Sequence, residues 1–340
     1  AERNLGVLVE RIHQIAPSHV FLQAFADPDG DGAADATYFP NRHLPMRSDL
    51  FNRVAWQLQT RANVRVFAWM PVLGWRPQPG PDTPRMLEAE DPADIPRLDP
   101  TDQRTRAWVG DLYEDLAVAA PFSGLLFHDD AYLRESEARS LPQGARTGAL
   151  IDLTMSLRDR AERWRPKLVT VRNLFARPVL DPSSETWFAQ RLDAFNAAYD
   201  YTALMAMPYM EQAEQPAAWL DTLFTRIAAS PQGLQRTMFE LQAVDWRAQD
   251  AVPAEVLKAQ TRRLYTFALD AKTPIPPSNP PYFPKPLEAK DFQVDDKLAE
   301  EGSWLFKESC AMCHGGGAVS GGYAPDLRAS PIPLNAQAFK

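Results

Sequence analysis

Six short apolar runs alternate along the first part of the chain with longer segments whose apolar residues recur at helical spacing. Short apolar runs separated by helical stretches indicate strand–helix units, which place their strands in a parallel sheet covered by helices. The expected strands are residues 19–25, 65–70, 124–128, 168–173, 201–207 and 236–242.

The segments between the runs carry the periodicity of amphipathic helices. In residues 48–61, Phe51, Val54, Ala55 and Leu58 recur at i, i+3, i+4 and i+7, and Ser48 is the predicted N-cap. Similar spacing predicts helices over residues 102–119, 184–199, 216–229 and 253–265.

Polar side chains at the ends of the strands decide between two architectures. A doubly wound sheet would be favoured by a glycine-rich phosphate loop, and none follows an expected strand. Functional side chains at the carboxyl ends of strands are typical of a barrel active site. We therefore expect a (β/α) TIM-like barrel. Only six strands are evident, so the barrel is either incomplete or hides one or two more strands.

Composition and charge exclude several classes of function. The formal net charge is -8, which argues against nucleic acid as a partner and is compatible with a cationic one. The sequence has no apolar run long enough for a membrane span, and its start shows no signal-peptide core. If the protein is exported, we expect its signal to have been removed.

An acidic loop, FADPDGDGAAD, follows the first expected strand. The functional interpretation is a substrate-facing loop that includes Asp27 and Asp29. The alternating acids also resemble a calcium loop, but the twelfth position from Asp27 is Tyr38 where an EF-hand requires Glu. A solvated turn built by Asp and Gly is the third alternative.

Three carboxyl groups are the candidates for catalysis. Glycoside hydrolysis usually needs two carboxyl groups, one protonated and one ionised. Asp129 and Asp130 follow His128 at the end of the third strand, and neighbours on a strand point to opposite sides. We expect one of them to act chemically and the other to brace it or bind a sugar amine, unless both cap a helix. Glu240 on the last strand is the candidate partner carboxylate, unless it forms a buried ion pair.

Four aromatic residues lie at or just after strand ends, Trp69, Trp75, Tyr209 and Trp246. Sugar rings stack on exposed aromatic faces, so Trp69, Tyr209 and Trp246 are candidates for substrate binding. The alternative for each is an ordinary place in the core.

Three segments of this region resemble one family. They are the run from Val20 to Leu73, beginning VFLQAFADPDGDGAAD, and the segments GLLFHDDAYL and RTMFELQAVDW. They resemble the C-terminal hydrolase domain of the poly-β-1,6-N-acetyl-D-glucosamine N-deacetylase family over about residues 1–266. The resemblance implies a periplasmic (β/α) barrel that cleaves partially de-N-acetylated poly-β-1,6-N-acetylglucosamine internally and needs no cofactor. It implies the acid role for Asp129 or Asp130, and a groove lined by acids such as Asp27, Asp29 and Glu240. His128, beside the two aspartates, is a further candidate for substrate binding.

The chain departs from this family at both ends. The resemblance covers only the hydrolase domain of the family, so we expect no deacetylation. Residues 267–290 contain the proline-dense run TPIPPSNPPYFPKP, which indicates an extended linker.

Residues 291–340 contain a different motif. Cys310, Cys313 and His314 form C-x-x-C-H, the attachment site of c-type haem, with His314 as the iron ligand. A redox C-x-x-C is the alternative, and zinc would lack a second ligand pair. The segments FALDAKTPIPP and GSWLFKESCAMCHGGG resemble the linker and cytochrome c domain of quinoprotein alcohol dehydrogenases. That family uses a downstream Met as the sixth iron ligand, and no Met follows His314, so the cytochrome segment is expected to be truncated.

Overall fold

The computed structural model describes residues 2–88, 94–137, 141–142, 144–245, 248–270, 295–297, 299–300 and 302–303. Trp246 and the haem-motif residues Cys310, Cys313 and His314 lie outside these residues, as does the proline-dense run. The predictions for them are therefore not addressed by the fold.

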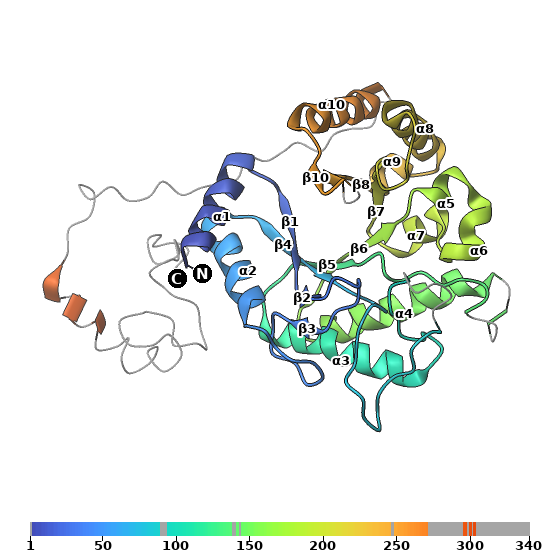
Figure 1. Ribbon diagram of the computed structural model, residues 1–340. Helices are drawn as coiled ribbons and strands as arrows, with labels where there is room; N and C mark the ends of the chain where they lie inside the picture. Colours follow the sequence, from blue (N-terminus) through green and yellow to red (C-terminus); the bar gives the residue numbers. More distant parts are fainter. Residues whose placement is uncertain are drawn as a thin grey trace.

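Six parallel strands form one curled sheet in the order β1-β4-β5-β6-β7-β8, which is also their order in the chain (Figure 1). Within the described residues β8 does not pair with β1, so the sheet is an incomplete (β/α) barrel. The six predicted strands are confirmed to within one or two residues at each end. Their bounds are β1 His19–Gln23, β4 Arg65–Met70, β5 Gly124–Phe127, β6 Val169–Leu174, β7 Tyr201–Ala206 and β8 Thr237–Leu241.

Helices follow the strands and cover the outside of the sheet (Figure 1). They are α1 Glu2–Ile15, α2 Leu50–Ala62, α3 Gln103–Ala119, α4 Ala145–Glu162, α5 Arg177–Leu180, η1 Pro182–Ser184, α6 Glu185–Phe188, α7 Leu192–Ala198, α8 Pro216–Ala229, α9 Gly233–Arg236 and α10 Ala254–Asp270. Two short antiparallel pairs lie outside this sheet. One is formed by β2 Phe25–Ala26 and β3 Ala36–Thr37, and the other by β9 Val244–Asp245 and β10 Asp250–Ala251. Among the described residues, none of the helices has the length and hydropathy of a membrane span.

Two helix predictions were wrong in detail. The helix expected over residues 184–199 is split into α6 and α7, because Ala189 takes a left-handed conformation with φ 51° that ends α6. Ser48 is not the N-cap of α2. Asp49 holds that position, without a side-chain capping bond, whereas Asp102 caps α3 by accepting the backbone N–H of Arg104.

Strand alternation divides the buried residues into two sets. The larger set packs between the sheet and the helices, where Phe127 of β5 stacks on Tyr113 of α3 with ring centroids 5.9 Å apart. The smaller set fills the inside of the curled sheet. We call it the lumen cluster, and it consists of Phe67, Leu126, Val171 and Ala203. This apolar floor leaves the carboxyl ends of the strands, which we call the mouth, for polar side chains.

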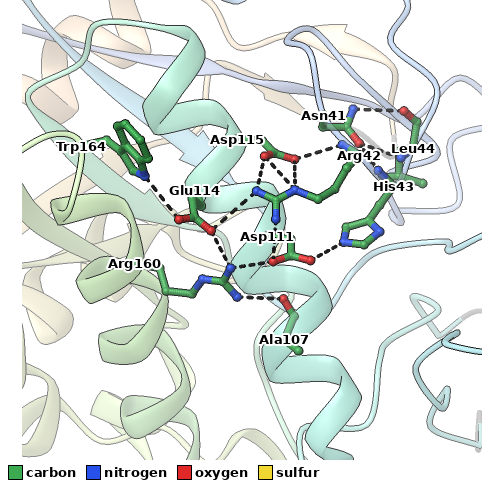
Figure 2. Close-up of polar contacts among 10 residues, drawn as sticks. All are labelled: Asn41, Arg42, His43, Leu44, Ala107, Asp111, Glu114, Asp115, Arg160 and Trp164. Atoms are coloured by element: carbon green, nitrogen blue, oxygen red, sulfur yellow. Dashed lines mark hydrogen bonds and ion pairs between the residues drawn. The ribbon is translucent and has the colours of Figure 1, made fainter.

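A network of ion pairs fastens the outer wall of the barrel, where the loop before α2 meets α3 and α4 (Figure 2). Its acids are on α3, and its bases come from the loop and from α4. We call it the outer-wall cluster, and its charged residues are Arg42, Asp111, Glu114, Asp115 and Arg160.

Candidate active site

The mouth is lined by inward-pointing residues that come one position before or after the strand ends. Trp69 lies two residues beyond Phe67 of the lumen cluster, and the same spacing relates His128 to Leu126 and Asn173 to Val171. Glu240 likewise follows Met238, which packs against that cluster. Since side chains two apart on a strand share a face, all four belong to the inner face of the sheet.

Glu240 has a neutral amide as its partner. Asn173 Nδ2 donates to Glu240 Oε2 at 2.8 Å, across the width of β7. Burial and the negative charge of Asp129 raise the pKa of Glu240 to about 7, against the lowering effects of the Asn173 bond and the charge of His128. At neutral pH a large fraction of Glu240 is therefore protonated, which is the state that a general acid needs.

Asp129 is held in the opposite state. His128 Nδ1 lies 2.9 Å from Asp129 Oδ1. Burial alone would raise the pKa of Asp129, but the charge and hydrogen bond of His128, together with the charge of Arg172, bring it below its usual value. Asp129 is 24% exposed, so it is ionised and still open to a ligand.

His128 is the positive member of this group. Burial favours its neutral form, but the neighbouring carboxylates of Asp129 and Asp130 outweigh burial and raise the pKa of His128 well above its ordinary value. Its ring lies between aromatic neighbours, with centroids 5.1 Å from Trp69 and 5.6 Å from Phe25. The expected substrate-binding residue is thus an imidazolium that pairs with Asp129.

Asp130 is closed off from solvent. Its side chain is fully buried and lies 3.5 Å from His128 Nδ1. Its carboxylate accepts the backbone N–H groups of three successive residues after β4, Val72 at 2.9 Å, Leu73 at 2.6 Å and Gly74. These bonds tie the turn after β5 to the loop after β4. The arrangement favours Asp129 over Asp130 as the carboxylate that meets a substrate.

The acidic loop after β1 brings together the carboxylates of Asp27, Asp29 and Asp35, with ligand oxygens within 4.8 Å of one another. Asp27 also shapes the loop, because its two oxygens accept the N–H groups of Gly30 at 2.8 Å and Gly32 at 2.9 Å. Burial and the charges of Asp29 and Asp27 raise the pKa of Asp35. The loop is therefore a local source of negative potential beside β1, with oxygen ligands that suit a cation.

The other expected aromatic residues are only partly placed. Trp69 packs edge-on against Phe25, with centroids 5.8 Å apart, and Tyr209 is half-buried in the loop after β7. Trp246 lies outside the described residues.

Sequence reasoning gave no role to two residues at the end of β6. Asn173 is the hydrogen-bond partner of Glu240, and the fully buried Arg172 donates to backbone carbonyls beside Asp129. The signal was the Arg-Asn pair that closes an otherwise apolar strand. Which groups those side chains would reach depends on strand curvature, which the sequence pattern does not specify.

Known proteins match the two segments separately. The chain is 43% identical over 282 residues to the poly-beta-1,6-N-acetyl-D-glucosamine N-deacetylase of Escherichia coli, covering 72% of this chain and 42% of the relative. It is also 41% identical over 73 residues to the quinohemoprotein alcohol dehydrogenase ADH IIB of Pseudomonas putida, covering 20% of this chain and 10% of that protein. The chain thus spans less than half the length of these relatives. Both resemblances stated from the sequence are supported.

A solved structure supports the fold over most of the chain. The PgaB (BpsB) glycoside hydrolase domain from Bordetella bronchiseptica is 42% identical, with a TM-score of 0.72, over 78% of this chain and 86% of that domain. The model of hypothetical glycosyl hydrolase family 13 matches residues 1–146 and 142–271. The chain therefore belongs to hypothetical glycosyl hydrolase family 13.

Proposed function

We propose that the barrel is an endo-acting glycoside hydrolase that cleaves partially de-N-acetylated poly-β-1,6-N-acetylglucosamine. The observation that carries this proposal is that two carboxyl groups at one mouth have pKa values shifted in opposite directions. The pKa of Glu240 is raised to about 7, while that of Asp129 is lowered. A glycosidase needs one protonated and one ionised carboxyl group near the scissile bond.

The two environments also support an assignment of roles within this proposal. Glu240 protonates the glycosidic oxygen, which is a poor leaving group until it gains a proton. Asp129 remains ionised and acts on the sugar or on the attacking water. The resemblance had implied the acid role for Asp129 or Asp130, so this assignment exchanges the expected roles of Asp129 and Glu240. Asp130 braces the site.

The substrate class follows from the relatives and from charge. The deacetylase of Escherichia coli is named for poly-β-1,6-N-acetyl-D-glucosamine, and the removal of acetyl groups exposes amines that are cationic at neutral pH. The carboxylates of Asp27, Asp29 and Asp35 supply the negative potential that attracts such amines. A fully acetylated polymer offers no ammonium group, so we expect it to be a poor substrate.

The test compares Asp129→Asn with Asp159→Asn, whose carboxyl group is 62% exposed on α4. New reducing ends and polymer length are measured on partially deacetylated and fully acetylated polymer. We expect the Asp129 variant to lose roughly two to four orders of magnitude in rate and the Asp159 variant to keep it. Polymer length should fall early in the reaction. Binding of the polymer without new reducing ends in the wild type would show a glycan-binding barrel instead.

For the C-terminal segment we propose a c-type haem site at Cys310 and Cys313, with His314 as an iron ligand, and a periplasmic location for the protein. The motif and the partial similarity to a quinohemoprotein support this. Expression with a cytochrome c maturation system should give covalent haem absorbance in the periplasmic fraction. The Cys310→Ala, Cys313→Ala double variant should remove that absorbance and leave glycan cleavage unchanged.

A further inference from the structure

The turn that carries Asp129, residues His128–Ala131, is hydrogen-bonded to a buried cation that has no part in the proposed chemistry. Arg172 of β6 is fully buried. Its guanidinium donates to the backbone carbonyl of Phe127 at 3.2 Å and also to those of His128 and Ala131. A single side chain thus contacts both ends of the turn.

Asp130 grips the same turn from its other side. Its carboxylate accepts hydrogen bonds from backbone N–H groups of the loop after β4. Asp130 and Arg172 therefore both fix the turn to neighbouring strand ends. No ion pair joins Arg172 to a carboxylate within the part of the chain that the structure describes. Its other neighbours are neutral, namely the hydroxyl of Tyr199 and the ring of Phe195, whose centroid lies 5.4 Å from the guanidinium carbon. Burying a cation without a carboxylate partner is costly, which suggests that Arg172 is retained for the contacts it makes around the turn.

We infer that Arg172 is a positioning residue of the glycosidase site, which fixes the backbone that carries the Asp129 carboxylate at the mouth. The inference rests on the proposed function. The carbonyl bonds fix the backbone on both sides of Asp129. A displacement of about 1 Å in a reacting group can cost on the order of 100-fold in rate.

The charge of Arg172 acts together with the other groups around Asp129. These are His128 beside it, Glu240 on β8 and Asp130 in the same turn. Two buried tyrosines are also near, Tyr113 of α3 within the electrostatic influence of Asp130, and Tyr199, which is hydrogen-bonded to Arg172. His128 and Arg172 are the cations, and Glu240 and Asp130 are the acids. Losing one of two cations should leave Asp129 easier to protonate.

Arg146 provides a matched control. It is also buried, at 6% exposure, and also donates to backbone carbonyls, to Leu133 at 3.0 Å and Thr186 at 2.8 Å. Its contacts fasten the loop after β5 to α6, so they resemble those of Arg172 chemically but do not involve the turn that carries Asp129.

The experiment compares Arg172→Met, Arg172→Lys and Arg146→Met. For each variant we measure thermal unfolding, kcat and KM on partially deacetylated polymer across pH, and the titration of the Asp129 carboxyl carbon by NMR, assigned with Asp129→Asn. For Arg172→Met we expect kcat to fall on the order of 100-fold with KM changed much less. The acidic limb of the kcat–pH profile of this variant, and the titration of its Asp129 carboxyl group, should both move to higher pH by on the order of one pH unit.

The other two variants separate position from charge. Arg172→Lys keeps the charge without the planar fork, so we expect kcat to fall while the Asp129 titration stays near that of the wild type. Arg146→Met should lower the unfolding temperature without moving the titration. The inference is overturned if Arg172→Met behaves like Arg146→Met, with lower stability and an unmoved titration.

Two further results keep the inference separate from the proposed function. If Arg172→Met does not fold, Arg172→Lys decides: unchanged kcat would overturn the positioning role and a lowered kcat would support it. If the wild type cleaves no polymer, the proposed function fails, and the Asp129 titration of the variants still decides whether Arg172 controls that carboxyl group.

Discussion

Carboxyl groups meet nitrogen donors both in the outer-wall cluster and at the mouth, but the donors differ. On the outer wall, Arg160 Nη2 lies 2.6 Å from oxygens of both Asp111 and Glu114 (Figure 2). Hydrogen bonds from Arg160 and Trp164 outweigh partial burial and lower the pKa of Glu114. At the mouth Glu240 has the neutral amide of Asn173, and its pKa rises to about 7.

The difference separates a structural acid from the acid that we propose to be reactive. Glu114 is fully satisfied as a carboxylate, so it has little tendency to bind a proton near neutral pH. Glu240 is half-buried near another carboxylate and has a neutral amide as its hydrogen-bond partner, so it binds a proton more readily, as the proposed acid role requires. Two glutamates on one barrel thus acquire opposite properties from their partners, and perturbed groups of the second kind are typical of functional sites.

The largest expected effect comes from removing the proton donor. Glu240→Gln should lower the rate of polymer cleavage by roughly two to four orders of magnitude, because the amide cannot protonate the leaving oxygen. The matched change on the outer wall, Glu114→Gln, should leave the rate near that of the wild type. Reducing ends are counted for both variants on the same partially deacetylated polymer. Equal losses in the two variants would break the comparison.

The pH dependence of cleavage should show the same contrast. Because Glu240 must be protonated and its pKa is about 7, kcat/KM should fall as the pH rises through about 7. The limb at acid pH should reflect protonation of Asp129, whose pKa lies below its usual value. Glu114→Gln should retain both limbs. An unchanged alkaline limb in the residual activity of Glu240→Gln would assign that limb to another group.

The sheet was predictable from sequence because its strands are short and apolar, and polar or turn-forming residues end each of them. Val66–Ala68 and Gly124–Phe127 have no competing helical pattern. The sequence left open whether the barrel was incomplete or contained hidden strands, and within the described residues β8 does not pair with β1. The prediction of secondary structure failed where the backbone conformation of a single residue ends a helix, as at Ala189.

The candidate site was predictable in its members but less so in their roles. Asp129 and Asp130 are chemically identical and adjacent, and alternation predicts only that they diverge. The Asp130 carboxylate accepts hydrogen bonds from the backbone N–H groups of residues 72–74, which lie 56–58 positions away in the sequence. The raised pKa of Glu240 comes from burial and from the charge of Asp129 at the end of β5, and its hydrogen-bond partner Asn173 is two strands away. Such long-range contacts follow from the curl of the sheet and leave no local pattern.

A smaller effect is expected on stability, with opposite signs in the two regions. Glu240 binds its proton more tightly in the folded chain, so its favourable contribution is complete below pH 4.5 and is lost as the pH rises through about 7. Glu240→Gln should therefore be more stable than the wild type at pH 8, by on the order of 2 kcal/mol, and equal to it below pH 4.5.

For Glu114 the folded pKa is lowered, so its contribution is present above pH 4.5 and lost as the pH falls through the folded value. Glu114→Gln should cost about 1 kcal/mol at pH 8 and nothing in strong acid. Urea unfolding at pH 8 and pH 4 measures both variants. Destabilisation of both at pH 8 would mean that Glu240 is a structural carboxylate like Glu114.

The smallest effect is expected at the exposed edge of the outer-wall cluster. Arg42 is 49% exposed, and its guanidinium contacts Asp115, with Nη2 at 2.6 Å and Nε at 3.0 Å from Oδ1. An exposed pair contributes little because water and salt screen it, but the two-pronged geometry places this one near the upper end of that range. Arg42→Ala should lower the free energy of unfolding by about 0.5–1 kcal/mol at low salt, and by less in 1 M NaCl. Arg42→Lys, which keeps the charge without the planar fork, should have a stability between those of the wild type and Arg42→Ala.

Polymer cleavage should be unchanged in both variants, since the cluster lies outside the barrel between α3 and α4. A loss of cleavage in Arg42→Ala at full folding would show that the outer wall and the mouth are coupled, and the contrast between them would have to be abandoned.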